Sequence, residues 1–151
     1  MLNSRHFGAI DDSEDYAAVK PWRRAGMRID VNVDKPAAFS QAAIDAVDRA
    51  LDAIDALEAA AREAFTAVLA DDSSQPAQFW QFYRDEVEGF ASLAREDFVA
   101  RLELVRAGCY PAGDAGGKVV LDFKLPGIET DQILVANLAF DGALLGIAWE
   151  S

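Results

Sequence analysis

The spacing of apolar residues changes twice along this chain, and these changes limit the fold more than any other feature. From Met27 to Asp34 apolar and polar residues alternate strictly, which is the two-residue period of a strand with one buried face. From Gln41 to about Ala70 the apolar residues recur every three or four positions, as on one stripe of a helix. Alternation returns from Lys118 to Leu125. The sequence therefore predicts strands, then helices, then strands.

The predicted elements form one domain of the α+β class. Short loops favour antiparallel neighbours, and a layer of two to three helices on one face of a mostly antiparallel sheet is the simplest arrangement. Asp141-Gly142 marks a tight hairpin turn between the last two strands. The chain has 151 residues, which fits a single domain. The expected ranges are 19–22 and 27–34 for an N-terminal hairpin, 41–70, 76–87 and 95–100 for helices, and 102–110, 118–125, 132–140 and 143–150 for C-terminal strands.

Charge and cysteine content exclude several classes of function. The chain has 26 acidic and 14 basic residues, a net charge of −12, and such a field repels phosphate backbones. We therefore expect no binding to nucleic acid. The single cysteine, Cys109, excludes an internal disulfide, and no apolar run is long enough to span a bilayer. These features predict a soluble protein of the cytoplasm that does not associate with membranes.

No set of residues has the spacing of a known catalytic or metal site. The chain lacks the Gly-x-Ser-x-Gly turn of hydrolases, and with a single histidine, His6, it cannot build a site from several histidines. The fragment Asp30-x-Asn32-x-Asp34 begins like a calcium loop, but Lys35 takes the position where that loop needs glycine. We expect no catalytic residues, no metal and no cofactor.

Arg106 interrupts an apolar strand pattern and is expected to be buried. It shares a strand face with Leu102 and Leu104. A buried guanidinium is costly unless it is paired, so we expect a carboxylate partner, for which Asp122 and Glu150 are the candidates. An ion pair that ties strands together is the favoured interpretation, because structural networks also bury charge.

The alternative interpretation of the same arginine is functional. Arg106, Tyr110 and Asp122 would then form a site that holds a small anionic ligand or carries out a reaction. A polar pocket at the sheet would favour this alternative.

Four aspartates on the long predicted helix form the most distinctive surface feature. Asp45, Asp48, Asp52 and Asp55 follow one another at spacings of three, four and three, which places them on one stripe beside the apolar residues. Two interpretations are open. The stripe is either a solvated face, as most charge runs are, or a docking surface for a basic protein.

Small size, strong acidity and the aspartate stripe favour a non-enzymatic protein-binding module. An immunity-type protein that neutralises a basic toxin is one form that such a module takes. A further possibility is a homo-oligomer that buries aromatic helix surface from Phe79, Trp80 and Phe82.

Segments near both ends of the chain match a known family more closely than the helical middle does. They are Phe7 to Ile10, Ile29 to Val33, Val105 to Pro111, Leu121 to Phe123, Thr130 to Val135, Phe140 to Gly142 and Trp149 to Ser151. In these segments the chain resembles a bacterial family that is catalogued as a domain of unknown function, numbered two thousand and four. The resemblance implies the same strands and turns that the periodicity predicts, and it brings no catalytic residues.

Overall fold

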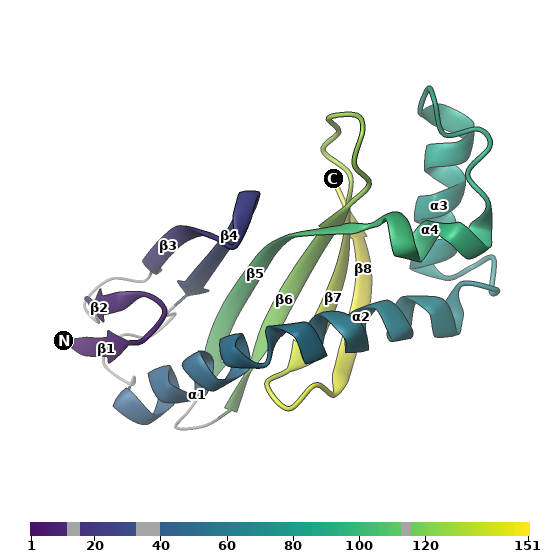
Figure 1. The fold of residues 1–151 in the computed structure, drawn as a ribbon. Coiled ribbons are helices and arrows are strands. Elements are labelled where there is room, and N and C mark those ends of the chain that lie inside the picture. The colour runs from purple at the N-terminus through teal and green to yellow at the C-terminus, as the bar shows by residue number, and fades with distance from the viewer. Residues whose placement is uncertain (12–15, 33–39, 113–115) are drawn as a thin grey trace.

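The computed structural model describes residues 1–11, 16–32, 40–112 and 116–151 and confirms the predicted α+β class. Within these ranges the helices α1 and α2 lie along one face of the larger sheet (Figure 1). In chain order the elements are β1 (Leu2–Ser4), β2 (Gly8–Ile10), β3 (Tyr16–Trp22), β4 (Arg24–Asn32), α1 (Gln41–Asp52), α2 (Ile54–Val68), α3 (Gln75–Glu86), α4 (Arg95–Arg101), β5 (Glu103–Ala112), β6 (Gly116–Lys124), β7 (Ile133–Ala139) and β8 (Leu144–Glu150).

A six-stranded sheet in the order β3-β4-β5-β6-β7-β8 forms the body of the protein. The neighbouring strands are antiparallel except β4 and β5, which run parallel and align Arg28 with Arg106 and Val31 with Cys109. A parallel pair needs a long crossover connection, and the segment that contains α1 to α4 provides it between β4 and β5. The prediction of a mostly antiparallel sheet is confirmed, with one parallel pair where the helices intervene.

The single long helix predicted from Gln41 to about Ala70 is divided in two. Ala53 leaves the helical conformation, with φ −95° and ψ 18°, and separates α1 from α2. The helix starts as predicted, because the Ser40 side chain accepts a hydrogen bond from the Ala43 N–H at 3.3 Å. With a break in its middle, the apolar stripe can follow the twist of the sheet over both helices. Within the described ranges, no helix is long and apolar enough to cross a membrane.

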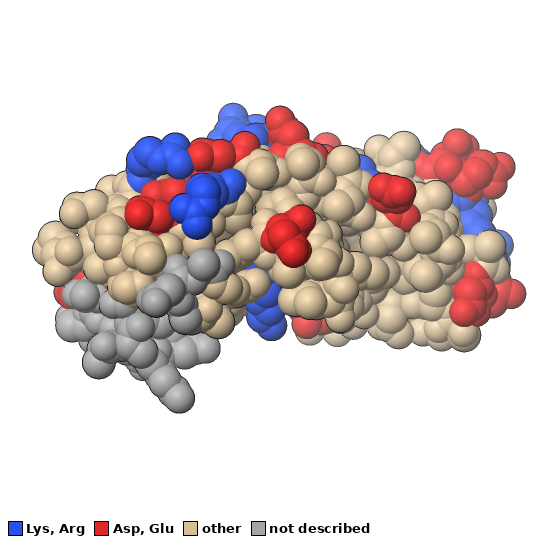
Figure 2. Space-filling model, turned by 90° about the horizontal axis from the view of Figure 1, so that it is seen from below, with Lys and Arg blue, Asp and Glu red and all other residues tan. Residues whose placement is uncertain are grey.

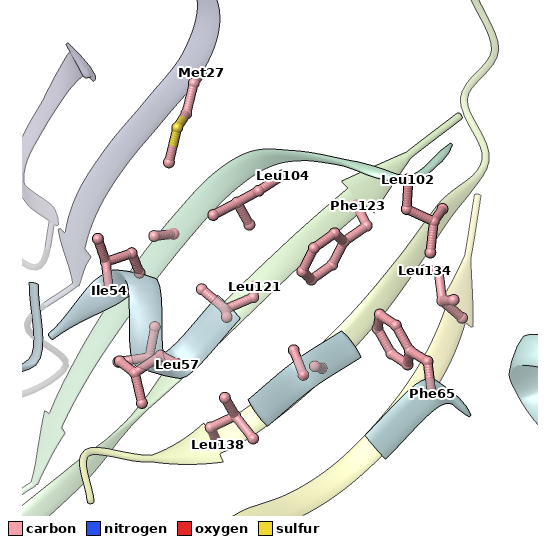
Figure 3. Close-up of a cluster of buried hydrophobic side chains, with 14 of the residues drawn as sticks. Met27, Ile54, Leu57, Phe65, Leu102, Leu104, Leu121, Phe123, Leu134 and Leu138 are labelled. Atoms are coloured by element: carbon pink, nitrogen blue, oxygen red, sulfur yellow. The ribbon is translucent and has the colours of Figure 1, made fainter. Parts of the chain in front are cut away.

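The core lies between α1, α2 and the sheet face turned toward them (Figure 3). The Phe65 ring of α2 meets the Phe123 ring of β6 edge-on, with 5.3 Å between the centroids. Strand residues in the alternate positions, among them Arg28, Arg106 and Asp122, lie on the opposite face of the sheet. Further buried members of the core include Met27, Ile54, Leu57, Leu104, Leu121, Leu134 and Leu138.

The sequence does not predict the second sheet, which consists of β1 and β2. These strands pair antiparallel, and β1 packs against α1. Strands of three residues are too short to show a period, so the pattern contained no signal for them. The predicted hairpin is present as β3 and β4; residues 33–39, with Asp34 and Lys35 of the calcium-like fragment, lie outside the described residues.

Candidate functional site

Arg106 lies at the centre of a polar network on the sheet face opposite the helices. Its Nε and Nη2 donate to the two carboxylate oxygens of Asp30, at 2.6 and 2.8 Å, and Nη2 also donates to the Tyr110 hydroxyl at 2.9 Å. Burial lowers the pKa of Arg106, but the hydrogen bonds to Asp30 and Tyr110 outweigh it and raise the pKa above its ordinary value. The predicted carboxylate partner of Arg106 is therefore present, as a two-point ion pair between neighbouring strands.

The identity of that partner corrects the sequence analysis. The alternation from Met27 to Asp34 predicts that Asp30 faces water, and this prediction is wrong, because only 1% of the residue is exposed. In the parallel register Asp30 lies beside Gly108, and Arg106 folds over Gly108 to reach it. A Cβ atom on Gly108 would lie 2.3 Å from Arg106 Nη2, so glycine is what leaves room for the guanidinium.

Asp122 of β6 is the second carboxylate beside Arg106. Its Oδ2 lies 3.5 Å from Arg106 Nη1, whereas its Oδ1 is buried with no hydrogen-bond partner among the described residues. Burial raises the pKa of Asp122, and the charge of Arg106 opposes this shift. Glu150, the other candidate partner, makes no ion pair with Arg106 in the described part of the chain. Asp122 is thus a buried carboxyl group that is only half satisfied.

A cleft of about 730 Å³ opens beside Arg106 and Asp122, on the sheet face opposite the helices. Its walls come from β4, β5, β6 and the loop 125–132, which projects past the end of the sheet between β6 and β7 (Figure 1). Of the three residues that the sequence suggests for a ligand site, Arg106 and Asp122 line this cleft. Tyr110 contacts Arg106 without being part of the lining.

Hydrogen bonds hold the loop that forms one wall of the cleft. Lys124 Nζ donates to the Thr130 carbonyl at 2.9 Å, and the Thr130 hydroxyl bonds the Tyr83 hydroxyl at 2.5 Å. Burial raises the pKa of Tyr83 although this hydrogen bond acts in the opposite direction. Thr130 of the loop is therefore tied both to β6 and to α3.

The aspartates of the predicted stripe make contacts within the protein. Asp48 is buried and accepts hydrogen bonds from the Ser4 hydroxyl at 2.5 Å and from the Arg5 N–H at 2.9 Å. Asp52 accepts hydrogen bonds from Arg5 and His6, which lower the pKa of Asp52 to about 2. These two carboxylates fasten the small sheet of β1 and β2 to α1.

The other two aspartates of the stripe also have neighbours. Asp55 pairs with Arg23 at 2.5 Å, and Asp45 accepts a hydrogen bond from Gln41 Nε2 at 2.9 Å. Figure 2, which views the molecule from below, accordingly shows red and blue side chains interspersed at the end that holds α1. A docking role for the stripe stays a prediction, and any partner would have to compete with these internal contacts.

Replacing Asp48 with alanine is expected to lower the free energy of unfolding by about 2 kcal/mol, because the Ser4 hydroxyl and the Arg5 N–H both lose a charged acceptor. Chemical denaturation measures the loss. Asp45→Ala is the matched control on the same helix, since Asp45 is exposed and should cost less than about 0.5 kcal/mol. Equal losses in the two variants would contradict the anchoring role.

The aromatic residues of α3 are mostly internal. Phe79 and Trp80 are buried, and the Trp80 indole N–H donates to the Leu93 carbonyl at 2.9 Å. Phe82 is half-buried and lies near Trp149 of β8, with 5.4 Å between the ring centroids. Self-association through this surface stays a prediction, with Phe82 as the member that a partner can reach.

Phe82 and Trp149 line a shallow hollow of about 280 Å³ between α3 and the edge strand β8. Asp85 and Glu86 also line it, as do Gln78 and Gln81. Gln132 and Gln75 hold Trp149 in place: Gln132 Oε1 accepts from the indole N–H at 2.7 Å, and Gln75 Oε1 accepts from the backbone N–H at 3.0 Å. The hollow, which we call the α3–β8 hollow, therefore combines two aromatic rings with two carboxylates.

The strand that borders the α3–β8 hollow is an edge of the sheet. β8 pairs with β7 alone among the described strands. Leu144 and Leu145 at its start are 48% and 59% exposed, and a bulge interrupts the pairing there, between Asn137 and Leu138 of β7. Gln75 of α3 already accepts from the Trp149 backbone N–H near the end of β8, so the surface that other chains can contact is the start of the strand with its exposed leucines.

Cys109 and the acidic residues provide no further site. Cys109 is buried, and burial raises the pKa of its thiol to about 12, so the thiol stays protonated and unreactive. Among the described residues, no group of three or more His, Cys, Asp or Glu side chains is arranged to hold a metal ion.

Comparison of the chain with models of protein families, with curated proteins and with solved structures finds no match. The resemblance to the family of unknown function therefore stays a prediction. Function has to be argued from the geometry of the chain itself.

Proposed function

We propose that this protein is a non-enzymatic binding module that docks a basic protein on the α3–β8 hollow and the neighbouring edge of β8. The single observation that carries the proposal is the combination of an aromatic pair with acidic residues beside an edge strand whose start carries exposed leucines. A lysine or arginine side chain fits such a hollow, because it can stack on an aromatic ring and meet a carboxylate at its tip.

The charge distribution around the hollow supports a basic partner. Asp85 is half exposed and pairs with Arg84, whereas Glu86 is exposed and makes no hydrogen bond or ion pair with the described residues. The chain carries a net charge of −12, which attracts a basic protein from a distance and speeds its association.

Apolar contacts would add to the charged ones. Leu144 and Leu145 lie on the same strand as Trp149, four to five residues away, which corresponds to roughly 13–17 Å along β8. A partner that covers the hollow and reaches the leucines would combine charged and apolar contacts.

A designed peptide tests the proposed surface. An extended peptide of alternating valine and lysine should shift the NMR signals of the Trp149 indole and of β8 amides, and high salt should weaken its binding. Glu86→Lys should lower the affinity roughly tenfold, because it reverses the charge of a carboxylate in the hollow. The same peptide with glutamate in place of lysine should not bind.

Glu63→Lys is the matched control for this experiment. Glu63 is an exposed residue of α2, so the substitution changes the net charge equally without touching the hollow. Equal weakening by Glu86→Lys and Glu63→Lys would mean that net charge alone attracts the peptide, and the proposed surface would be refuted. Shifts confined to another face would refute it as well.

We propose a basic toxin as the biological partner, with this chain as an immunity-type protein that acts in the cytoplasm. Fast association through opposite charge suits a protein that must capture a toxin before the toxin acts. The gene for a basic toxin should then lie beside the gene for this chain. The toxin should co-purify with the wild-type protein and be lost from Glu86→Lys.

A further inference from the structure

The cleft on the opposite sheet face carries a second, independent inference. It lies beside Asp122, whose Oδ1 has no hydrogen-bond partner among the described residues although only 8% of Asp122 is exposed. Buried carboxylate oxygens are almost always hydrogen-bonded, so an unsatisfied oxygen on a residue that lines a formed cleft indicates a missing donor, which the side chain has to turn slightly to reach. A cleft with such a group is a candidate ligand site.

The cations around the cleft are largely occupied already. Arg106 donates three hydrogen bonds to Asp30 and Tyr110, and only its Nη1 reaches toward Asp122. Lys124 donates to the backbone carbonyl of Thr130. Carboxylates therefore engage Arg106 on two sides, whereas Lys124 keeps its positive charge, because its acceptor is a neutral carbonyl.

Acidic groups at and beside the cleft slightly outnumber the basic ones. Glu103 and Glu129 are exposed and make no hydrogen bond or ion pair with the described residues, and Asp122 is half satisfied. Among the cations of the lining, Arg28 alone makes no hydrogen bond or ion pair with the described residues. The lining holds three carboxylates and three cations, and Asp30, which pairs with Arg106, adds a fourth carboxylate beside it; in a chain of net charge −12, this balance favours a cationic ligand over an anionic one.

Apolar side chains supply the rest of the lining. They come from β5, from the loop and from the start of β7, and they are Val105, Leu125, Pro126, Ile128 and Ile133. A ligand with an apolar body can bury that body against these residues while its polar head meets the acidic end.

We propose that this cleft binds a small organic ammonium compound, a protonated amine with an apolar body, whose N–H groups donate to the Asp122 carboxylate. An ammonium group supplies up to three donors and a positive charge, which are what a half-satisfied buried carboxylate lacks. The proposal does not depend on the α3–β8 hollow, because the two sites share no lining residue.

The proposal implies a pH dependence of a definite sign. Arg28 and Asp30 from β4, Arg106 from β5 and Glu150 from β8 are the charged groups around Asp122. Since the pKa of Asp122 is raised above its ordinary value, the free protein holds a proton on Asp122 over a wider pH range than an exposed aspartate does. An amine binds to the ionised form, so its affinity should rise as the pH passes upward through that pKa and then level off. A carboxylate ligand would show the opposite slope.

Three probes with the same phenylethyl body test the proposal: 2-phenylethylamine, 2-phenylethanol and 3-phenylpropionate. Each is titrated into the protein while NMR follows the Asp122 carboxyl carbon and the amides of residues 125–132. The amine should bind saturably and at least tenfold more tightly than the carboxylate. Preferential binding of 3-phenylpropionate, or affinity for the amine that falls as the pH rises, would overturn the proposal. Absence of saturable binding by the amine would overturn it too.

Variants locate the binding in the cleft. Asp122→Asn keeps the shape of the side chain and should weaken amine binding at least tenfold. Asp97→Asn is the matched control, because it removes the same charge from an exposed position on α4 and should leave the affinity unchanged. Ile128→Arg, at an exposed position of the lining, should weaken binding of the amine by adding a cation. Affinity within twofold of the wild type in Asp122→Asn and Ile128→Arg would refute the site.

Discussion

Replacing Arg106 with methionine is expected to lower the free energy of unfolding by about 3–5 kcal/mol. The substitution leaves the Asp30 carboxylate, 1% exposed, with the Asn32 side chain as its remaining hydrogen-bond donor among the described side chains. A buried carboxylate without a counter-charge is far more costly than a lost surface contact. Denaturation by urea, followed by circular dichroism, measures the change.

Two further variants separate the ion pair from general damage to the strand. Arg28→Met removes an exposed arginine that is aligned with Arg106 on the neighbouring strand, and it should cost less than about 0.5 kcal/mol. Adding Asp30→Asn to Arg106→Met should restore part of the lost stability, because no buried charge is then left unpaired. If the double variant is less stable than Arg106→Met alone, the ion pair is not the cause of the loss.

Replacing Phe65 with alanine is expected to lower the free energy of unfolding by about 3–5 kcal/mol. Phe65 is fully buried and packs edge-on against Phe123, at the place where α2 lies on the sheet (Figure 3). The substitution removes both the buried apolar surface and the ring contact, and it leaves a cavity that close-packed neighbours fill poorly. The same urea denaturation gives the measurement.

Phe65→Leu is the graded control. Leucine keeps most of the apolar volume, so it should cost clearly less than alanine, on the order of 1–2 kcal/mol. A loss below about 1 kcal/mol in Phe65→Ala would show that the contact between α2 and the sheet contributes little to stability.

Most of the fold could be predicted from local patterns. The alternation in β4 and β6, the helical stripe from Gln41 to about Ala70 and the Ser40 cap each depend on residues close together in the chain. The Asp-Gly turn between β7 and β8 is of the same kind. Two features of the fold were not predicted. Strands β1 and β2 are too short to show a period, and the break at Ala53 has no sequence signal, because alanine favours a helix.

The candidate sites could be predicted only in part. The mismatch of Arg106 with its apolar surroundings correctly indicated a paired guanidinium, and Asp122 was correctly placed near it. The expected shared face with Leu104 was wrong, because an irregularity between Leu104 and Arg106 turns the half-buried Arg106 to the sheet face opposite the core. Asp30 was missed, because its partner comes from a strand more than seventy residues later in the chain. The pairing of Phe82 with Trp149 was missed for the same reason, since α3 and β8 are distant in the sequence.

By itself, the sequence determined the class of the fold, the order of its elements and the inward face of most strands and helices, because hydrophobic period acts over a few residues. Only the tertiary structure decided which charges are free. The parallel pairing of β4 with β5 buries Asp30 under Arg106, and the packing of β1 and β2 on α1 occupies Asp48 and Asp52. A side chain's charge is local, but its partner and its exposure depend on chain segments that folding brings together.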